Sequence, residues 1–139
     1  MNAVDPAAAG WKPRALEGFI GLVGPLWTLR ENDAWAYGIV PELRHTNPAG
    51  IVHGGLLVTL IDHALSTIAW EAASRRPCVT IQLDTRFLAP VHPGKLVEAR
   101  GRVARLTAGL VFMEGSLVVD GDAVLNASTV LRILEQHRD

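Results

Sequence analysis

Cysteine is almost absent from this sequence, since Cys78 is the single one among 139 residues. One cysteine cannot close an intramolecular disulfide or supply the paired thiolates of a cysteine-rich zinc site. The five histidines show no HExxH motif and no paired ligand spacing; they are His45, His53, His63, His92 and His137. The sequence therefore predicts neither a disulfide framework nor a metal site, and we expect no resident cofactor.

Charge of either sign is also scarce. Charged residues make up 19% of the chain and the formal net charge is -1. A chain without a basic excess lacks the electrostatic footprint of a nucleic-acid-binding protein. The hydrophobic content of 49% excludes a disordered chain, and the length suits one domain.

Long hydrophobic runs are missing as well. Thr59, Asp62 and Ser66 interrupt the most apolar segment well before the ~20 residues that a membrane span needs. Residues 1–5 show no basic stretch followed by the apolar core of a signal peptide. We therefore expect a cytoplasmic protein with neither a membrane nor a nucleic acid as partner.

The N-terminal part predicts a short helix followed by a hairpin. Residues 12–20 fit a short helix, and two strands are expected at 26–30 and 34–39 because polar turn residues separate them. We divide the chain into an N-terminal segment, 1–24, and a main domain, 25–139.

Residues 54–74 predict one long helix. Apolar side chains recur there at helical spacing around most of the circumference, so the helix should be buried nearly all round. Two arginines and a proline, Arg75 to Pro77, fit a positively charged and abrupt helix end.

After this helix the hydrophobic period changes to two. Strands are predicted at 79–88, 95–106, 110–119 and 123–134, joined by turns in an antiparallel meander. One long apolar helix supplies the cover that one face of such a sheet requires. The predicted fold class is α+β, with an antiparallel sheet wrapped around one central helix.

Asp62 stands in the middle of the predicted helix between apolar neighbours. A carboxylate is costly to bury there unless it is paired or used. Apolar surroundings make a carboxylate more basic, which suits a general base or a nucleophile. A purely structural interpretation is also open, in which Asp62 bonds Thr59 or Ser66, one turn away on either side.

His53, Gly54 and Gly55 lead directly into the helix. The glycines let a ligand approach the backbone, and the first helical N–H groups lack intrahelical partners. With the helix dipole they form a candidate oxyanion site, although a helix entry without a ligand would look the same. Asn47, in the preceding loop, could donate its side-chain amide to a carbonyl, although an Asn-Pro turn needs no function.

The helix spacing separates the Gly55 N–H from the Asp62 carboxylate. Gly55 and Asp62 lie seven positions apart, or about 10 Å of helix rise. One subunit cannot easily place both against one carbonyl carbon. A two-fold dimer with antiparallel helices would bring Gly55 of one subunit toward Asp62 of the other.

The segments 45–56 and 59–62 together carry the asparagine loop, His-Gly-Gly and the helical acid. With 79–83 and 87–90, they resemble the hot-dog fold acyl-CoA thioesterases. The similarity is greatest to the phenylacetate-degradation (PaaI) type, related to 4-hydroxybenzoyl-CoA thioesterases, and extends from about Trp27 onward. It implies a hot-dog fold, an acyl-CoA substrate whose coenzyme A is the only cofactor moiety, and a homodimer at minimum, with a homotetramer expected.

The resemblance also implies residue roles. Asn47 and the Gly55 N–H would hold and polarise the thioester carbonyl, with His53 in the turn that positions them. Asp62 of the neighbouring subunit would activate water or attack the carbonyl itself. Many relatives carry Glu where this chain has Asp62, so the general-base and anhydride routes both stay open.

Two hydroxyl groups and a groove complete the implied site. Thr80, where close members can carry Ser, would orient the water, and Ser66 would add a hydroxyl near the acid. The coenzyme A groove would be lined by Gln82, Phe87, Leu88, Pro90, His92, Arg105 and Gly109.

Two other functions fit a hot-dog fold. A hydratase or dehydratase of acyl thioesters has a loop histidine and a nearby acid, but here no acid precedes Asn47 and His53 comes too late. A non-catalytic acyl-CoA-binding module would gain nothing from a costly carboxylate beside the thioester. We therefore expect hydrolysis of an aryl- or medium-chain acyl-CoA. The residues expected to shape the acyl pocket are Val23, Leu26, Trp27, Leu57 and Trp70.

Overall fold

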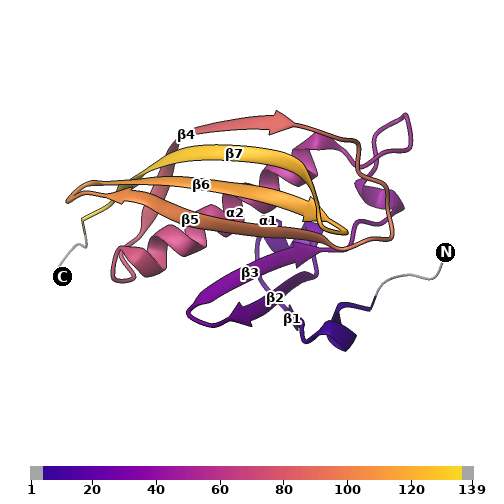
Figure 1. The fold of residues 1–139 in the computed structure, drawn as a ribbon, viewed down its shortest axis with the longest axis horizontal. Coiled ribbons are helices and arrows are strands. Elements are labelled where there is room, and N and C mark those ends of the chain that lie inside the picture. Colours follow the sequence, from indigo (N-terminus) through magenta and orange to yellow (C-terminus); the bar gives the residue numbers. More distant parts are fainter. Residues whose placement is uncertain (1–4, 136–139) are drawn as a thin grey trace.

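The computed structural model describes residues 5–135 (Figure 1). The expectations for Met1–Val4 and for His137 lie outside the described residues. Two helices and two short 3-10 turns accompany seven strands: η1 (Pro6–Ala9), β1 (Lys12–Arg14), α1 (Phe19–Val23), β2 (Leu26–Glu31), β3 (Ala34–Ile39), η2 (Leu43–His45), α2 (Gly54–Ala72), β4 (Cys78–Phe87), β5 (Val97–Leu106), β6 (Leu110–Val119) and β7 (Asp122–Ile133).

The strands form one antiparallel sheet in the order β1-β2-β3-β5-β6-β7-β4, and α2 lies along one face of it (Figure 1). The predicted hairpin β2–β3, the long helix and the fold class are confirmed. The meander is confirmed for β5, β6 and β7.

The position of β4 corrects the predicted meander. β4 pairs with β7 at the edge of the sheet and not with β5, the next strand in the chain. The connecting segment 88–96 is an extended loop with two prolines and not a tight turn. It therefore has the length to cross three strand spacings, about 14 Å, along the end of the sheet.

The predicted helix at 12–20 is wrong. Lys12–Arg14 forms the edge strand β1, which pairs with β2, and α1 begins only at Phe19. Gly18, with φ of 78°, separates the two elements because this backbone conformation ends regular structure of either kind. A proline is tolerated in β1 because an edge strand does not need every N–H in the ladder.

The core lies between α2 and the sheet. Leu60, Ile61, Ala64 and Leu65 are almost completely buried. The paired glycines Gly101 of β5 and Gly115 of β6 face Leu65, and a Cβ atom at Gly115 would lie 2.7 Å from its Cδ2 atom. Their lack of side chains lets α2 approach the sheet closely.

The opposite face of α2 is not covered within one chain. The sheet buries one side of α2, while Val58, Thr59, Asp62, His63 and Ser66 are only half-buried. The expectation of a helix buried all round is therefore wrong for a single chain, because the apolar stripe ends at this more polar face. Within residues 5–135, no helix combines the length and hydropathy needed to cross a membrane.

Candidate active site

The loop before α2 holds Asn47 in a fixed orientation. The Asn47 N–H donates to the Ile51 carbonyl oxygen at 2.8 Å, and Thr46 forms a β-bridge with Val52. The Asn47 Oδ1 atom accepts the N–H of Ala49 at 3.0 Å and that of Ile51 at 3.4 Å. These two bonds fix the orientation of the Asn47 amide. The side-chain NH2 group has no acceptor among the described residues and can donate to a ligand.

His53 caps the N-terminus of α2. Its Nδ1 atom accepts the Gly55 N–H at 2.8 Å, and a Cβ atom at Gly55 would lie 2.9 Å from the same nitrogen. The Gly55 N–H, predicted to be an unpaired oxyanion donor, is thus already hydrogen-bonded in this conformation. The preceding Gly54 N–H has no acceptor within the described part of the chain.

Asp62 receives its hydrogen bond from the sheet and not from its own helix. The Thr80 hydroxyl on β4 donates to Asp62 Oδ1 at 2.7 Å, and the Ser66 hydroxyl lies 3.5 Å from the Thr80 oxygen. The Thr59 hydroxyl donates instead to the Gly55 carbonyl oxygen. The partner that the purely structural interpretation expected, Thr59 or Ser66, is therefore wrong, and Thr80 takes its place.

A pocket of about 570 Å³ surrounds this acid and lies on the uncovered face of α2. It brings together three predicted site residues, Asp62, Ser66 and Thr80. The sequence reasoning missed the other lining residues except Thr59; they are Phe19, Ile20, Val58, His63 and Leu83. Polar and apolar side chains thus share the lining, and both of the residues from α1 are apolar.

A β-bulge in β4 creates this lining. The pairing with β7 shifts between Thr80, opposite Leu131, and Gln82, opposite Val130, so Ile81 is the extra residue. Beyond a bulge the alternation of faces changes phase. Thr80 and Leu83 therefore both line the pocket, whereas strict alternation would pair Thr80 with Gln82.

Gln82 accordingly lies away from the site. Its Nε2 atom donates to Asp84 Oδ2 at 2.9 Å, and both residues line a hollow that faces away from the pocket around Asp62. Gln82, which is predicted to line the coenzyme A groove, therefore does not line the pocket around Asp62.

His63 lines the pocket directly after Asp62 in the helix. Desolvation by burial holds its pKa below the ordinary value, and the neighbouring Asp62 carboxylate only partly offsets this effect. Its ring meets Tyr37 edge-on at 6.2 Å, and burial raises the pKa of Tyr37 to about 12. Both side chains are therefore neutral near pH 7. Across residues 5–135, no three His, Cys, Asp or Glu side chains gather as a metal site.

The remaining predicted groove residues lie at two separate ends of the molecule. Phe87 ends β4, and Leu88, Pro90 and His92 follow it near the start of α2, where the Phe87 ring lies beside Gly54. Arg105 lies near the end of β5 and Gly109 in the turn between β5 and β6, at the other end of the sheet (Figure 1). One subunit does not bring these two groups together.

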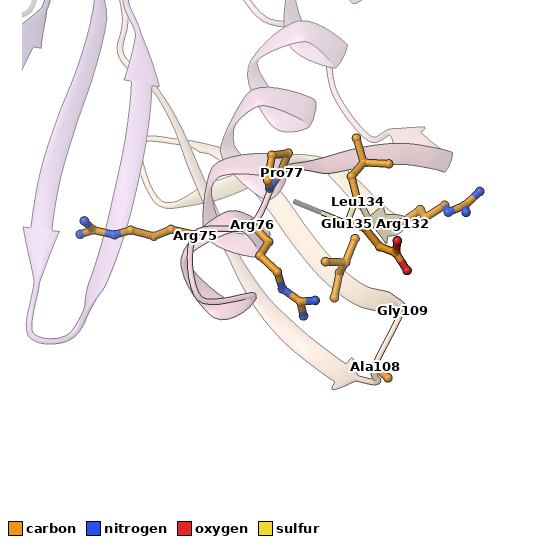
Figure 2. Close-up of a pocket in the computed structure, with 9 residues that line it drawn as sticks. Arg75, Arg76, Pro77, Ala108, Gly109, Arg132, Leu134 and Glu135 are labelled. Atoms are coloured by element: carbon orange, nitrogen blue, oxygen red, sulfur yellow. The ribbon is translucent and has the colours of Figure 1, made fainter. Parts of the chain in front are cut away.

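A second pocket, of about 920 Å³, lies at the end where α2 terminates (Figure 2). It contains Gly109 and three arginines, Arg75, Arg76 and Arg132. Figure 2 shows that Arg75 extends away from the Ala108–Gly109 turn and that Arg132 points in another direction. No pattern in the sequence indicated this cluster beyond the arginines that follow the helix.

Of the residues expected to shape the acyl pocket, none lines the cavity beside Asp62. Leu26 and Leu57 are 2% and 3% exposed and belong to the core. Trp70 lies toward the far end of α2, where its ring stacks with Arg75 at 5.3 Å. The prediction is therefore wrong for this pocket, because Leu26 and Leu57 pack in the core and Trp70 lies at the other end of the helix.

Known proteins share this fold and part of this sequence. Residues 49–125 match the family described as Thioesterase superfamily. A Pseudomonas aeruginosa protein named as an esterase is 32% identical over 91 residues, covering 65% of this chain and 68% of that protein. Acyl-coenzyme A thioesterase 13 of Mus musculus is 31% identical over 72 residues, and the match spans 51% of each chain.

A solved structure extends the likeness to the whole fold. A mutant of the phenylacetic acid degradation protein PaaI from Thermus thermophilus has a TM-score of 0.72 and 24% identity. The superposition covers 83% of this chain and 97% of that one, and at this identity it shows the shared fold alone. Because the family match spans more than half of the sequence, this chain belongs to the thioesterase superfamily, with the hot-dog fold that its sequence motif predicted.

Proposed function

We propose that this chain hydrolyses acyl-CoA thioesters, with an aryl or medium-chain acyl group, to the free acid and coenzyme A. The observation that carries the proposal is the Asp62 carboxylate, held by Thr80 in a pocket with one apolar wall. Its family membership already makes the chain a thioester hydrolase. We expect it to act in the cytoplasm, as its composition suggested.

Asp62 supplies the reactive group. In one route its carboxylate takes a proton from water while the water oxygen attacks the thioester carbonyl, and coenzyme A leaves as a thiolate that takes up the proton. In the other, the Asp62 carboxylate attacks the carbonyl carbon, the C–S bond breaks and coenzyme A leaves as a thiolate. Water then hydrolyses the mixed anhydride to the free acid and the Asp62 carboxylate, and the proton released goes to the thiolate. In both, Thr80 holds one carboxylate oxygen at 2.7 Å, while the other has no partner among residues 5–135 and can face the reaction. Neither route needs a cofactor beyond the coenzyme A of the substrate.

The carbonyl oxygen would be held by the N-terminus of α2 from a second subunit. The Asn47 NH2 group and the Gly54 N–H are available donors, and the Gly55 N–H becomes available when the His53 ring turns away. Removing one such donor typically costs about 3 kcal/mol of transition-state stabilisation.

An exposed strand edge supports the second subunit. β4 is one of the two edge strands of the sheet, and its side chains Val79, Ile81 and Phe87 are exposed. A long apolar edge of this kind favours pairing with another strand. Two copies joined through β4 about a two-fold axis would place their α2 helices antiparallel, each presenting Gly55 toward the partner's Asp62. The homotetramer stays a prediction from the resemblance.

The coenzyme A moiety has two candidate contacts. The exposed side chains of Phe87, Leu88, Pro90 and His92 lie next to the helix N-terminus, where the thioester would be held. The arginines of the second pocket, with Arg105 near the end of β5, suit phosphate groups because guanidinium groups donate in a fork.

Thiol release tests the proposal. We would measure hydrolysis of a panel of aryl- and aliphatic-CoA esters by the wild type and by Asp62→Asn, after confirming equal folding. Asp84→Asn is the matched control, because Asp84 is a carboxylate of β4 that lies outside the pocket. We expect Asp62→Asn to lose at least ~100-fold in kcat/KM and the control to stay within threefold. Binding of the esters without thiol release from the wild type would instead identify a non-catalytic acyl-CoA-binding module.

A further inference from the structure

The short helix α1 contributes two residues to the pocket around Asp62. Phe19 and Ile20 line it together with Val58 from α2 and Leu83 from β4. These four apolar side chains face the same space as the carboxylate. The space beside the reacting group is therefore suited to the apolar part of a substrate.

The exposure of α1 is unusual for its composition. Phe19 is 64% exposed and Leu22 is 71% exposed, whereas Ile20 is half-buried against the core. Phe19 borders the pocket and Leu22, on the same helix, does not. An exposed aromatic ring at the mouth of an open pocket gains most when a ligand covers it.

α1 is also fixed relative to the loop that carries Asn47. The Arg44 guanidinium donates to the Leu22 carbonyl oxygen at 2.5 Å and also to the Gly24 carbonyl oxygen. Arg44 belongs to η2, three residues before Asn47, and its Nε atom pairs with Glu42 at 2.6 Å. These bonds satisfy carbonyl groups at the end of α1 that the helix itself leaves unpaired. The apolar wall thus has a set position relative to the loop that would hold the thioester carbonyl.

We propose that α1 forms the specificity wall of the acyl site, with Phe19 and Ile20 in contact with the acyl group. This inference rests on the proposed function and names what sets its substrate class. A pocket with this wall selects an extended aliphatic or an aryl acyl group over an acetyl group. Each methylene that becomes buried against the wall should improve kcat/KM or binding about fourfold, until the wall is covered.

Chain-length profiles of wall variants test the inference. We would measure kcat/KM for acetyl-, butyryl-, hexanoyl-, octanoyl- and benzoyl-CoA with the wild type, Phe19→Ala and Ile20→Ala. Leu22→Ala is the matched control, since it removes an equally apolar side chain from α1 outside the pocket. We expect both wall variants to lose about tenfold on octanoyl-CoA relative to acetyl-CoA, while Leu22→Ala keeps the wild-type profile.

A binding measurement separates this inference from the proposed function. S-ethyl-, S-butyl- and S-octyl-CoA thioethers cannot be hydrolysed, so their affinities report on the wall whether or not the chain turns over esters. A wild-type affinity that rises with chain length and flattens in Phe19→Ala supports the wall, even if no ester releases thiol. Equal profiles in all four proteins would overturn it. A changed oligomeric state in Phe19→Ala with an unchanged profile would also overturn it, and would assign Phe19 to a subunit interface.

Discussion

Substitution of Gly55 by alanine tests the role of the helix N-terminus. The new Cβ atom would lie 2.9 Å from His53 Nδ1 and 3.0 Å from its Cε1 atom. The imidazole ring is the movable partner in this clash, so it should turn away and give up the 2.8 Å bond that caps the helix. A methyl group then occupies the place where a thioester carbonyl would approach the backbone.

The expected change in stability is small. Loss of the His53 cap should cost about 1 kcal/mol, as the loss of other N-cap side chains does. Alanine in place of glycine in a helix recovers about 0.5–1 kcal/mol of backbone entropy. The two terms nearly cancel, so the melting temperature of Gly55→Ala should stay within about 4 °C of the wild type.

The expected change in activity is large. Obstruction of the oxyanion site should lower kcat/KM about 10²–10³-fold. His53→Ala serves as the paired variant, because it loses the same cap but leaves the Gly55 N–H unobstructed, and it should retain more activity than Gly55→Ala. Thiol release and thermal unfolding measured on both proteins check these expectations. A folded Gly55→Ala with activity within threefold of the wild type would refute the placement of the thioester at this backbone.

Three further outcomes are expected. Thr80→Val should lose about tenfold or more in kcat/KM because a hydrogen bond to the Asp62 carboxylate disappears, whereas Thr80→Ser should retain most activity; steady-state kinetics compare them. Burial depresses the pKa of His63. Its contribution to the free energy of unfolding should therefore be fully present above the unfolded-state pKa, about 6.5, and be lost as the pH drops below it. Urea unfolding at several pH values should show a smaller loss of stability at low pH in His63→Gln than in the wild type. Gly101→Ala should lower the free energy of unfolding by about 1–3 kcal/mol, because the new methyl group overpacks against Leu65. Leu65→Ala in the same chain should recover part of this loss in urea titrations. Additive effects of the two substitutions would contradict the close approach of α2 to the sheet.

The sequence predicts the regular parts of this fold well. Apolar spacing in α2 and alternation in β5, β6 and β7 each extend over ten residues or more, so local pattern and tertiary burial agree. The segment 12–20 has no such pattern, and its structure is decided by pairing with β2, a contact that the local sequence does not encode. The order of β4 in the sheet was missed for a related reason, since a long loop leaves the pairing partner open.

The residues of the candidate site likewise fall into those that the sequence predicted and those that it did not. Asp62, Ser66 and Thr80 were predicted from a motif and a resemblance, and the structure gathers them in one pocket. Phe19 and Ile20 were missed because their position depends on Arg44, which lies more than twenty residues further along the chain. The hydrogen bond between Gly55 and His53 was missed because a side-chain orientation is not visible in a residue pattern.

The bulge at Ile81 has a consequence for how this site could be lost. Strand β4 runs in one phase up to Thr80 and in the opposite phase from Gln82 onward, with Ile81 as the extra residue. If the bulge were flattened with every residue kept, the two halves would share a single phase. With β4 kept in its present pairing from Gln82 onward, Ile81 would then lie opposite Leu131 and Thr80 would turn to the outer surface of the sheet. Its hydroxyl would leave Asp62, although every predicted catalytic side chain would remain in the sequence. A search for the motif residues alone would still count such a chain as complete.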